Sequence, residues 1–221
     1  MLDIVPKSMS LTTQDAEVTR TGGDRVRLWQ SHCEDANRHL NSGQHRKARQ
    51  KLRAALREAT HFGDHDERLA VTLLNLIACE VELKDGELTS EAALQLAEFA
   101  IHVHKNCHGR DSEETASCLL NVGVLLELSD HIQQANEALE EAIAITRRLE
   151  VQSKRVTTLR CHALYNRAAL LWSCDQVQTD KAAILAMVEE ALKIGEQIYG
   201  GKDGLVITMR QLRNDIRNDH R

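Results

Sequence analysis

The stretch that decides the fold is residues 116–128, ASCLLNVGVLLEL, together with residues 138–150, ALEEAIAITRRLE. Apolar residues in both segments return every three or four positions, which is the spacing of amphipathic helices. Each segment also carries small residues, and alanine or glycine at a helix crossing lets two backbones approach closely. The two segments therefore predict a pair of packed helices, a helical hairpin.

Similar segments recur along the chain. The second-helix segment has counterparts at residues 97–109 and 187–200, and the first-helix segment has counterparts at residues 69–83 and 162–172. Aligning them gives an alanine series with steps of 45, 42 and 49 residues: Ala55, Ala100, Ala142 and Ala191. A period of this length is typical of stacked helical repeats. We expect about four antiparallel hairpins, at residues 25–62, 66–108, 111–150 and 156–200.

The composition of the 221-residue chain agrees with an all-α fold. One proline, 3% aromatic residues and 42% hydrophobic residues allow a sizeable core but do not suit a β-sandwich or barrel. No run of 18 apolar residues occurs, and residues 1–20 lack a basic segment followed by an apolar one, so neither membrane insertion nor secretion is indicated. We therefore expect a cytoplasmic protein whose six cysteines are reduced and mostly buried.

The third hairpin carries the most complete motif. Leu119, Asn121 and Gly123 are spaced by two in its first helix, and Ala135 and Ala142 are seven residues apart in its second. This pattern resembles the tetratricopeptide repeat, and the long period with its closing glycine is similar to the kinesin-light-chain type. The resemblance implies an α-solenoid, a right-handed superhelical array over residues 24–221 that ends in a capping helix at 203–219. It also implies a protein-binding role connected with the cytoskeleton or with transport.

Capping residues and composition set the expected boundaries. Asp24 is the expected N-cap of the first helix, and residues 1–23, polar and without a period, are expected to be disordered. Gly63 and Gly109 separate successive hairpins, and the second hairpin carries an insertion around residues 85–90.

Two hairpins depart from the motif. His32 and Asp35 stand at positions of the first hairpin that are usually apolar. In the fourth hairpin Arg167 replaces an apolar residue, and Ile184 replaces a small one. The bulk of Ile184 argues either against a close helix crossing in that copy or for a register shifted by one residue, to Ala183.

The first helices of stacked hairpins line the concave side of such an array, so their exposed residues form the expected binding surface. Asn75, Asn121 and Asn166 occupy equivalent positions there, and Asn37 is the corresponding residue of the first hairpin. The apolar residues expected on the same side are Leu74, Leu120, Val124, Tyr165 and Trp172. In one interpretation the amides bind a partner's peptide backbone and the apolar residues hold its side chains. In the other, the asparagines bond to the neighbouring helix and the apolar residues belong to the core.

Some tetratricopeptide proteins clamp the C-terminal carboxylate of a chaperone. Asn37 and Asn75 match the two asparagine positions of that clamp, but Cys33, Ser117 and Asn121 stand where it has cations. Without Lys or Arg, the charge-assisted hydrogen bonds to the carboxylate are lost. Binding of such tails is therefore disfavoured.

His104, Cys107 and His108 are the best candidates for metal ligands. At spacing i, i+3 and i+4 they share one helix face, and all three residue types bind zinc. A fourth ligand is missing and the segment lies at a helix end, so a solvated or capping role is favoured and no metal is expected. The chain has neither a phosphate-binding glycine loop nor a serine-nucleophile motif, so we expect no enzyme activity, no cofactor and no small-molecule substrate.

Charge is distributed unevenly, although the net charge is only −5. Residues 25–60 hold nine Lys and Arg against three Asp and Glu, whereas residues 61–150 hold six against 18. Many of the basic residues form one patch: Arg46, Lys47, Arg49, Lys51 and Arg53. No aromatic residues lie between them to stack on bases, so nucleic acid is disfavoured. A solvated helix face is the simplest interpretation, and the alternative is an acidic partner protein, including the acidic segment of a second copy.

These features favour a non-catalytic scaffold or adaptor that binds a peptide or an amphipathic helix of a partner protein in its concave groove. The alternative is a regulatory subunit or sensor module whose groove is occupied by its own terminal segment. The last predicted helix could cap the array or supply that segment, because it has an apolar stripe of Leu205, Met209, Leu212 and Ile216.

Overall fold

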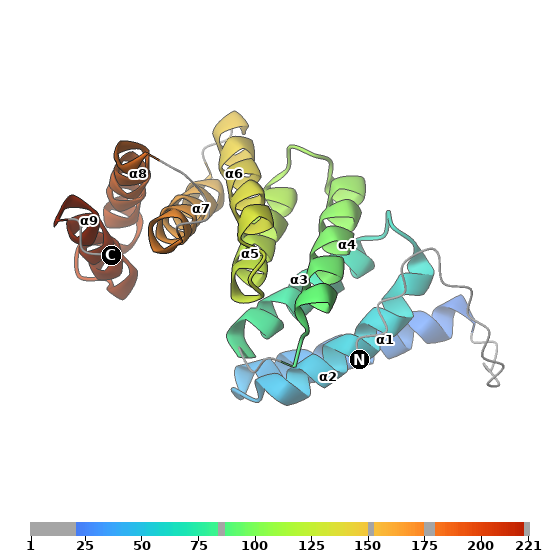
Figure 1. The fold of residues 1–221 in the computed structure, drawn as a ribbon. Coiled ribbons are helices and arrows are strands. Elements are labelled where there is room, and N and C mark those ends of the chain that lie inside the picture. The colour runs from blue at the N-terminus through green and yellow to red at the C-terminus, as the bar shows by residue number, and fades with distance from the viewer. Residues whose placement is uncertain (1–20, 84–86, 150–152, 175–179, 219–221) are drawn as a thin grey trace. The chain divides into compact units, whose positions relative to one another are not determined.

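The computed structural model describes residues 21–83, 87–149, 153–174 and 180–218, and these residues are helical with short connections (Figure 1). The prediction of an all-α chain is confirmed for this part, in which no strand occurs. Its elements are α1 Gly22–Asn41, α2 His45–Ala59, a 3-10 turn η1 Thr60–Phe62, α3 Glu67–Leu83, α4 Ser90–His108, α5 Glu113–Leu128, α6 Ile132–Arg148, α7 Lys154–Ser173, α8 Lys181–Tyr199 and α9 Gly204–Asn218.

The helices belong to two compact units, the first ending at Cys107 and the second beginning at His108. In the first unit α1 packs along α2, as Figure 1 shows, and α2 packs on α3. In the second unit α5 packs on α6, α6 on α7 and α7 on α8, and α9 closes the series against α8 and α7. Direct packing of α5 on α7 means that helices of successive pairs stack there. A superhelical path over residues 24–221 stays a prediction.

Gly123 explains how α5 and α6 pack so closely. A Cβ atom at this position would lie 2.6 Å from Cγ of Leu139 and 3.4 Å from the carbonyl oxygen of Ala135. Leu139, Ala135 and Ala142 are all fully buried at this crossing. The small residues of the motif therefore have the structural role that their spacing indicates.

The same turn joins α1 to α2 and α5 to α6. Gly43 and Asp130 both have positive φ, at 66° and 63°. The amide of the residue after each one donates a 2.8 Å hydrogen bond to the carbonyl five residues earlier, at His39 and Leu126. This is the Schellman ending of a helix, in which the left-handed residue suits glycine best. Two copies of one turn support the internal repeat.

The start of the first helix differs from the prediction. Thr21, not Asp24, is the N-cap, and its side chain accepts a hydrogen bond from the amide of Asp24. Gly22 and Gly23 are helical, so the boundary predicted at residue 23 is wrong by two residues. Residues 1–20, for which disorder was predicted, lie outside the described residues. The predicted insertion at residues 85–90 lies partly outside them, and α4 begins at Ser90.

Two of the unusual polar residues, Asp35 of the first hairpin and Arg167 of the fourth, have partners on a neighbouring helix, whereas the buried Nδ1 of His32 has none among the described residues. Asp35 accepts a 2.7 Å hydrogen bond from Lys51 of α2. Arg167 of α7 donates to Asn136 at 2.9 Å and lies 3.0 Å from the carboxylate of Glu140, both on α6. Charged groups can occupy these positions because the next helix supplies the opposite charge or an acceptor.

Ile184 does not prevent helix packing in the fourth hairpin. Its side chain is buried, and α8 still packs along α7. The two helices therefore pack despite the bulk of Ile184, and a less close crossing in this copy stays a prediction. Among the fully buried large side chains of the second unit are Leu119, Leu139, Ile145, Leu164, Leu170 and Ile184.

Candidate functional site

The asparagines of the predicted binding surface remain accessible. Asn75 on α3, Asn121 on α5 and Asn166 on α7 are partly exposed, and Asn37 on α1 is exposed. Within the described residues, none of these four side chains has a hydrogen-bond partner, and none of their polar atoms is buried without one. In the structural interpretation each asparagine would bond to its neighbouring helix. No such bond is found among the described residues.

The apolar residues expected beside the asparagines divide into two groups. Leu74, Val124 and Tyr165 are partly exposed, and each is adjacent to an asparagine position or one helical turn from it. Leu120 and Trp172 are buried, with 8% and 7% of their surface exposed. Little of either is left for a ligand, so the structure favours a core role for these two.

Two exposed apolar residues extend the asparagine-bearing faces and were missed in the sequence. Val71 stands one turn before Asn75 on α3, and Leu128 stands two turns after Asn121 on α5. They are 39% and 47% exposed. Both could have been found in the sequence, because they lie four and seven residues from the asparagines and so share their helix faces.

Tyr165 lies close to α5. Burial raises the pKa of its phenol, and the negative charge of Glu127 on α5 raises that pKa further. The phenol therefore stays protonated at neutral pH and can donate a hydrogen bond. Because α5 packs on α7, Asn121, Val124, Tyr165 and Asn166 all lie on two adjoining helices of one unit.

The predicted basic patch is largely neutralised inside the first unit. Arg49 is buried and pairs with Glu80 of α3 at 3.2 Å and with Glu87. Arg53 lies 3.1 Å from the same Glu80, and Lys51 lies 2.7 Å from Asp35 of α1.

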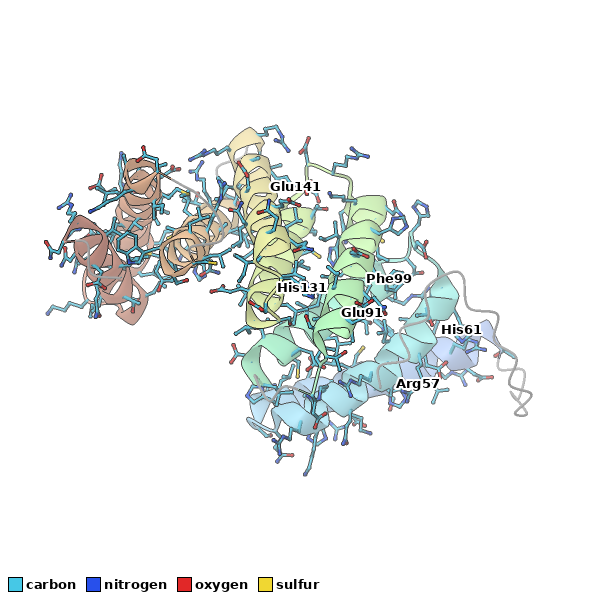
Figure 2. All side chains as sticks on the ribbon, in the orientation of Figure 1. Arg57, His61, Glu91, Phe99, His131 and Glu141 are labelled. Carbon is cyan, nitrogen blue, oxygen red and sulfur yellow. The ribbon has the colours of Figure 1, made fainter. Side chains whose placement is uncertain are left out.

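The expectation of a solvated five-residue face is therefore wrong for Arg49, whereas Lys51 and Arg53 are partly exposed but paired with carboxylates. Charges of opposite sign from α1 and α3, distant in the sequence, pack against α2. Arg46 and Lys47 stay exposed, as does the neighbouring Arg57, which Figure 2 shows on α2. The basic surface that could attract an acidic partner is therefore smaller than the sequence predicts.

The three candidate metal ligands do not form a site. His104 is buried, and its Nε2 donates to the carbonyl oxygen of Ala70 at 3.0 Å, so a solvated role is wrong for it. The Cys107 thiol lies 3.5 Å from the carbonyl oxygen of Asp64. No group of three His, Cys, Asp or Glu side chains in the described residues could hold a metal ion.

Cys33, Cys107 and Cys161 lack the environment of an activated nucleophile, because their thiols are held protonated. Burial raises the pKa of Cys161 to about 11, and it also raises the pKa values of Cys33 and Cys107. Cys161 donates to the carbonyl of Ala191, whereas its neighbour His162 pairs with the Tyr199 hydroxyl at 2.8 Å. The adjacent Cys and His therefore have separate partners, as expected for neighbours about 100° apart on a helix.

No protein-family model matches the chain, and no curated protein is significantly similar to it. The tetratricopeptide resemblance therefore rests on the residues of the repeat motif. Among the described helices, none combines the length and the apolar character that a membrane crossing requires.

Proposed function

We propose that the chain is a non-catalytic protein-interaction scaffold of the tetratricopeptide type. Its partner would be a peptide or an amphipathic helix that lies against the first helices of the hairpins. The observation that carries the proposal is the set of asparagine amides at matched positions, accessible and without a partner in the described residues. Amide groups with free donors and acceptors can pair with the backbone of a bound peptide.

The strength of binding follows from the apolar residues beside the amides. Leu74, Val124 and Tyr165 retain exposed surface, whereas Leu120 and Trp172 are mostly buried before any ligand arrives. Covering a side chain of this size is worth roughly 1.5 to 3 kcal/mol before the cost of ordering the peptide. Two or three such contacts give about micromolar affinity, which suits an adaptor or one site of a multivalent assembly.

The test is recovery of partners by the full chain and by the double variant Asn121→Ala/Tyr165→Ala. We expect the variant to lose most of the recovered partner, because it removes one amide and one exposed aromatic ring from adjoining helices. The matched control is Gln134→Ala/Glu137→Ala, two exposed residues of α6. Circular dichroism establishes that both variants are folded. Equal recovery by the wild type and a folded Asn121→Ala/Tyr165→Ala variant would exclude these faces as the binding site.

The alternative, a sensor module inhibited by its own last helix, receives less support. Val206, Met209 and Ile216 of α9 are fully buried, and α9 packs on α8 and α7 in the way that α7 packs on α6 and α5. We propose that α9 is a cap that covers the last hairpin. The cytoplasmic location, and the connection with the cytoskeleton or transport, are proposals that follow from the resemblance alone.

A further inference from the structure

Helices α8 and α9 face each other through a regular series of charged side chains. Arg210 lies 2.6 Å from the carboxylate of Glu196, and Arg217 lies 2.6 Å from that of Glu189. The earlier glutamate of α8 pairs with the later arginine of α9 and the later glutamate with the earlier arginine, so the helices are antiparallel. We call these two ion pairs and the residues between them the α8–α9 ladder.

The middle of the ladder brings together two positive charges. Lys193 lies one helical turn from both glutamates of α8, and Arg213 lies one helical turn from both arginines of α9. In antiparallel helices this spacing places Lys193 and Arg213 at the same level. In the described part of the chain, no carboxylate lies within ion-pair distance of either residue. Both residues line one surface hollow, and two like charges there repel each other unless an anion lies between them.

Arg213 has unused hydrogen-bonding capacity. Its Nη2 donates to the amide oxygen of the adjacent Asn214 at 3.3 Å. Its Nε–H is buried and has no acceptor among the described residues. A buried donor without an acceptor is unfavourable, and a guanidinium presents Nε and Nη in a fork that matches the two oxygens of a carboxylate.

A cavity that is open to solvent lies at the same place, and most of its lining residues are exposed. Its volume is about 440 Å³, and it is lined by Glu189, Leu192, Lys193, Glu196, Gln197 and Arg213. This volume is large enough for a side chain and the adjoining backbone of a bound peptide. Both unpaired cations therefore line a space that a ligand can enter.

We propose that this cavity binds a side-chain carboxylate from an acidic segment of a partner protein. The carboxylate lies between Lys193 and Arg213 and accepts hydrogen bonds from Nζ and from the Nε and Nη groups. Glu189 and Glu196 line the same cavity, and their charges are partly offset by the exposed ion pairs with Arg217 and Arg210. A singly charged carboxylate adds less repulsion against these two glutamates than a doubly charged phosphate does.

The site is separate from the asparagine-bearing faces. It is formed by α8 and α9, which carry none of the asparagines of the proposed scaffold surface. Failure of one proposal therefore leaves the other standing, and the variants that test them do not overlap.

The test uses the full chain and two labelled peptides, one rich in glutamate and one with glutamine at the same positions. We expect only the glutamate peptide to bind, and Arg213→Gln to weaken its binding by about tenfold. Lys154→Gln is the control, because it removes one positive charge from an exposed site at the start of α7 and should change affinity by less than about twofold. Glu189→Gln should tighten binding by about threefold, since it removes a repulsive charge and frees Arg217.

A direct readout is the NMR signal of the Arg213 Nε–H group, which should shift on addition of the glutamate peptide. Equal binding of both peptides, or an unchanged affinity in a folded Arg213→Gln variant, overturns the proposal. A response of this signal to inorganic phosphate but not to the glutamate peptide also overturns it, in favour of a phosphate site. If Arg213→Gln does not fold, Lys193→Gln on the exposed side of α8 is tested in its place, with the same expected loss.

Discussion

Two helical glycines of the second unit differ in the space around them, although both look alike in the sequence. Gly123 faces Leu139, and an added Cβ would overlap its Cγ at 2.6 Å. Gly195 faces Val206, Cys161 and Met209 at 3.4 to 3.5 Å, which is ordinary contact. The first glycine is therefore required for packing, whereas the second is not.

This difference predicts opposite effects of the same substitution. Gly123→Ala should lower the free energy of unfolding by about 1 to 3 kcal/mol, because the buried Leu139 must shift. Gly195→Ala should be neutral or stabilising by up to about 1 kcal/mol, because alanine favours the helix. Urea denaturation of both variants checks this, and equal changes in the two midpoints would contradict the account of the α5–α6 crossing.

At the scale of single residues, the sequence predicted what local spacing determines and missed what depends on distant partners. The small residues at Gly123 and Ala135 could be found because they belong to one repeating motif. Lys51 and Arg49 were taken for surface charges, but their partners Asp35 and Glu80 are 16 and 31 residues away. No local pattern marks such a pair, so burial of Arg49 follows only from the packing of α2 on α3.

At the scale of the elements, the repeated turn offers a stability prediction. The left-handed residue is Gly43 in the α1–α2 turn but Asp130 in the α5–α6 turn. Asp130→Gly should raise the free energy of unfolding by about 0.5 to 1 kcal/mol, because glycine adopts this conformation without strain.

The reciprocal change, Gly43→Asp, is the matched control and should lower stability by a similar amount. No atoms lie within 4 Å of a Cβ at Gly43, so only backbone strain contributes to the loss. Thermal unfolding followed by circular dichroism measures both. A loss of stability in Asp130→Gly would contradict the equivalence of the two turns.

Helix positions were predicted more accurately than helix faces. The N-cap of the first helix, Thr21, lies three residues before the expected Asp24. Aspartate is preferred over threonine as an N-cap, but the difference is small and both are good capping residues, so intrinsic preference does not decide between them. Leu120 and Trp172 were placed beside the asparagines by helical geometry. A residue about 100° away on the helix can equally face the next helix, and both side chains are buried. The α8–α9 ladder needs the register between two helices, which the sequence of either helix alone does not contain.

At the scale of the whole molecule, stability should respond to mild acid through a histidine in each unit. Burial, followed by the nearby charge of Lys51, lowers the pKa of His32 on α1. Burial alone lowers the pKa of His162 on α7. The unfolded chain therefore binds protons before the folded chain does, starting as pH falls through the ordinary histidine range near about 6.5.

The sign of the effect follows from this order of protonation. Stability should fall as pH decreases from about 7.5 to about 5.5, with a slope of at most about 1.4 kcal/mol per pH unit for each histidine. Hydrogen bonds from Lys51 and Arg68 are the main reason that the pKa values of Asp35 and Asp66 are lowered. These two carboxylates therefore lose their contribution to stability only at lower pH, where they become protonated. Above the pH range in which these carboxylates become protonated, the change in stability therefore reports on the histidines.

Two variants make the pH prediction specific. His32→Gln and His162→Gln should each flatten the dependence of the urea midpoint on pH, because each removes one group that takes up a proton on unfolding. His61→Gln, at an exposed histidine on the 3-10 turn after α2, serves as the control for replacing an imidazole that is not buried. A wild-type midpoint that is constant over this range, or an equal slope in all three variants, would show that neither of these partly buried imidazoles resists protonation in the folded protein.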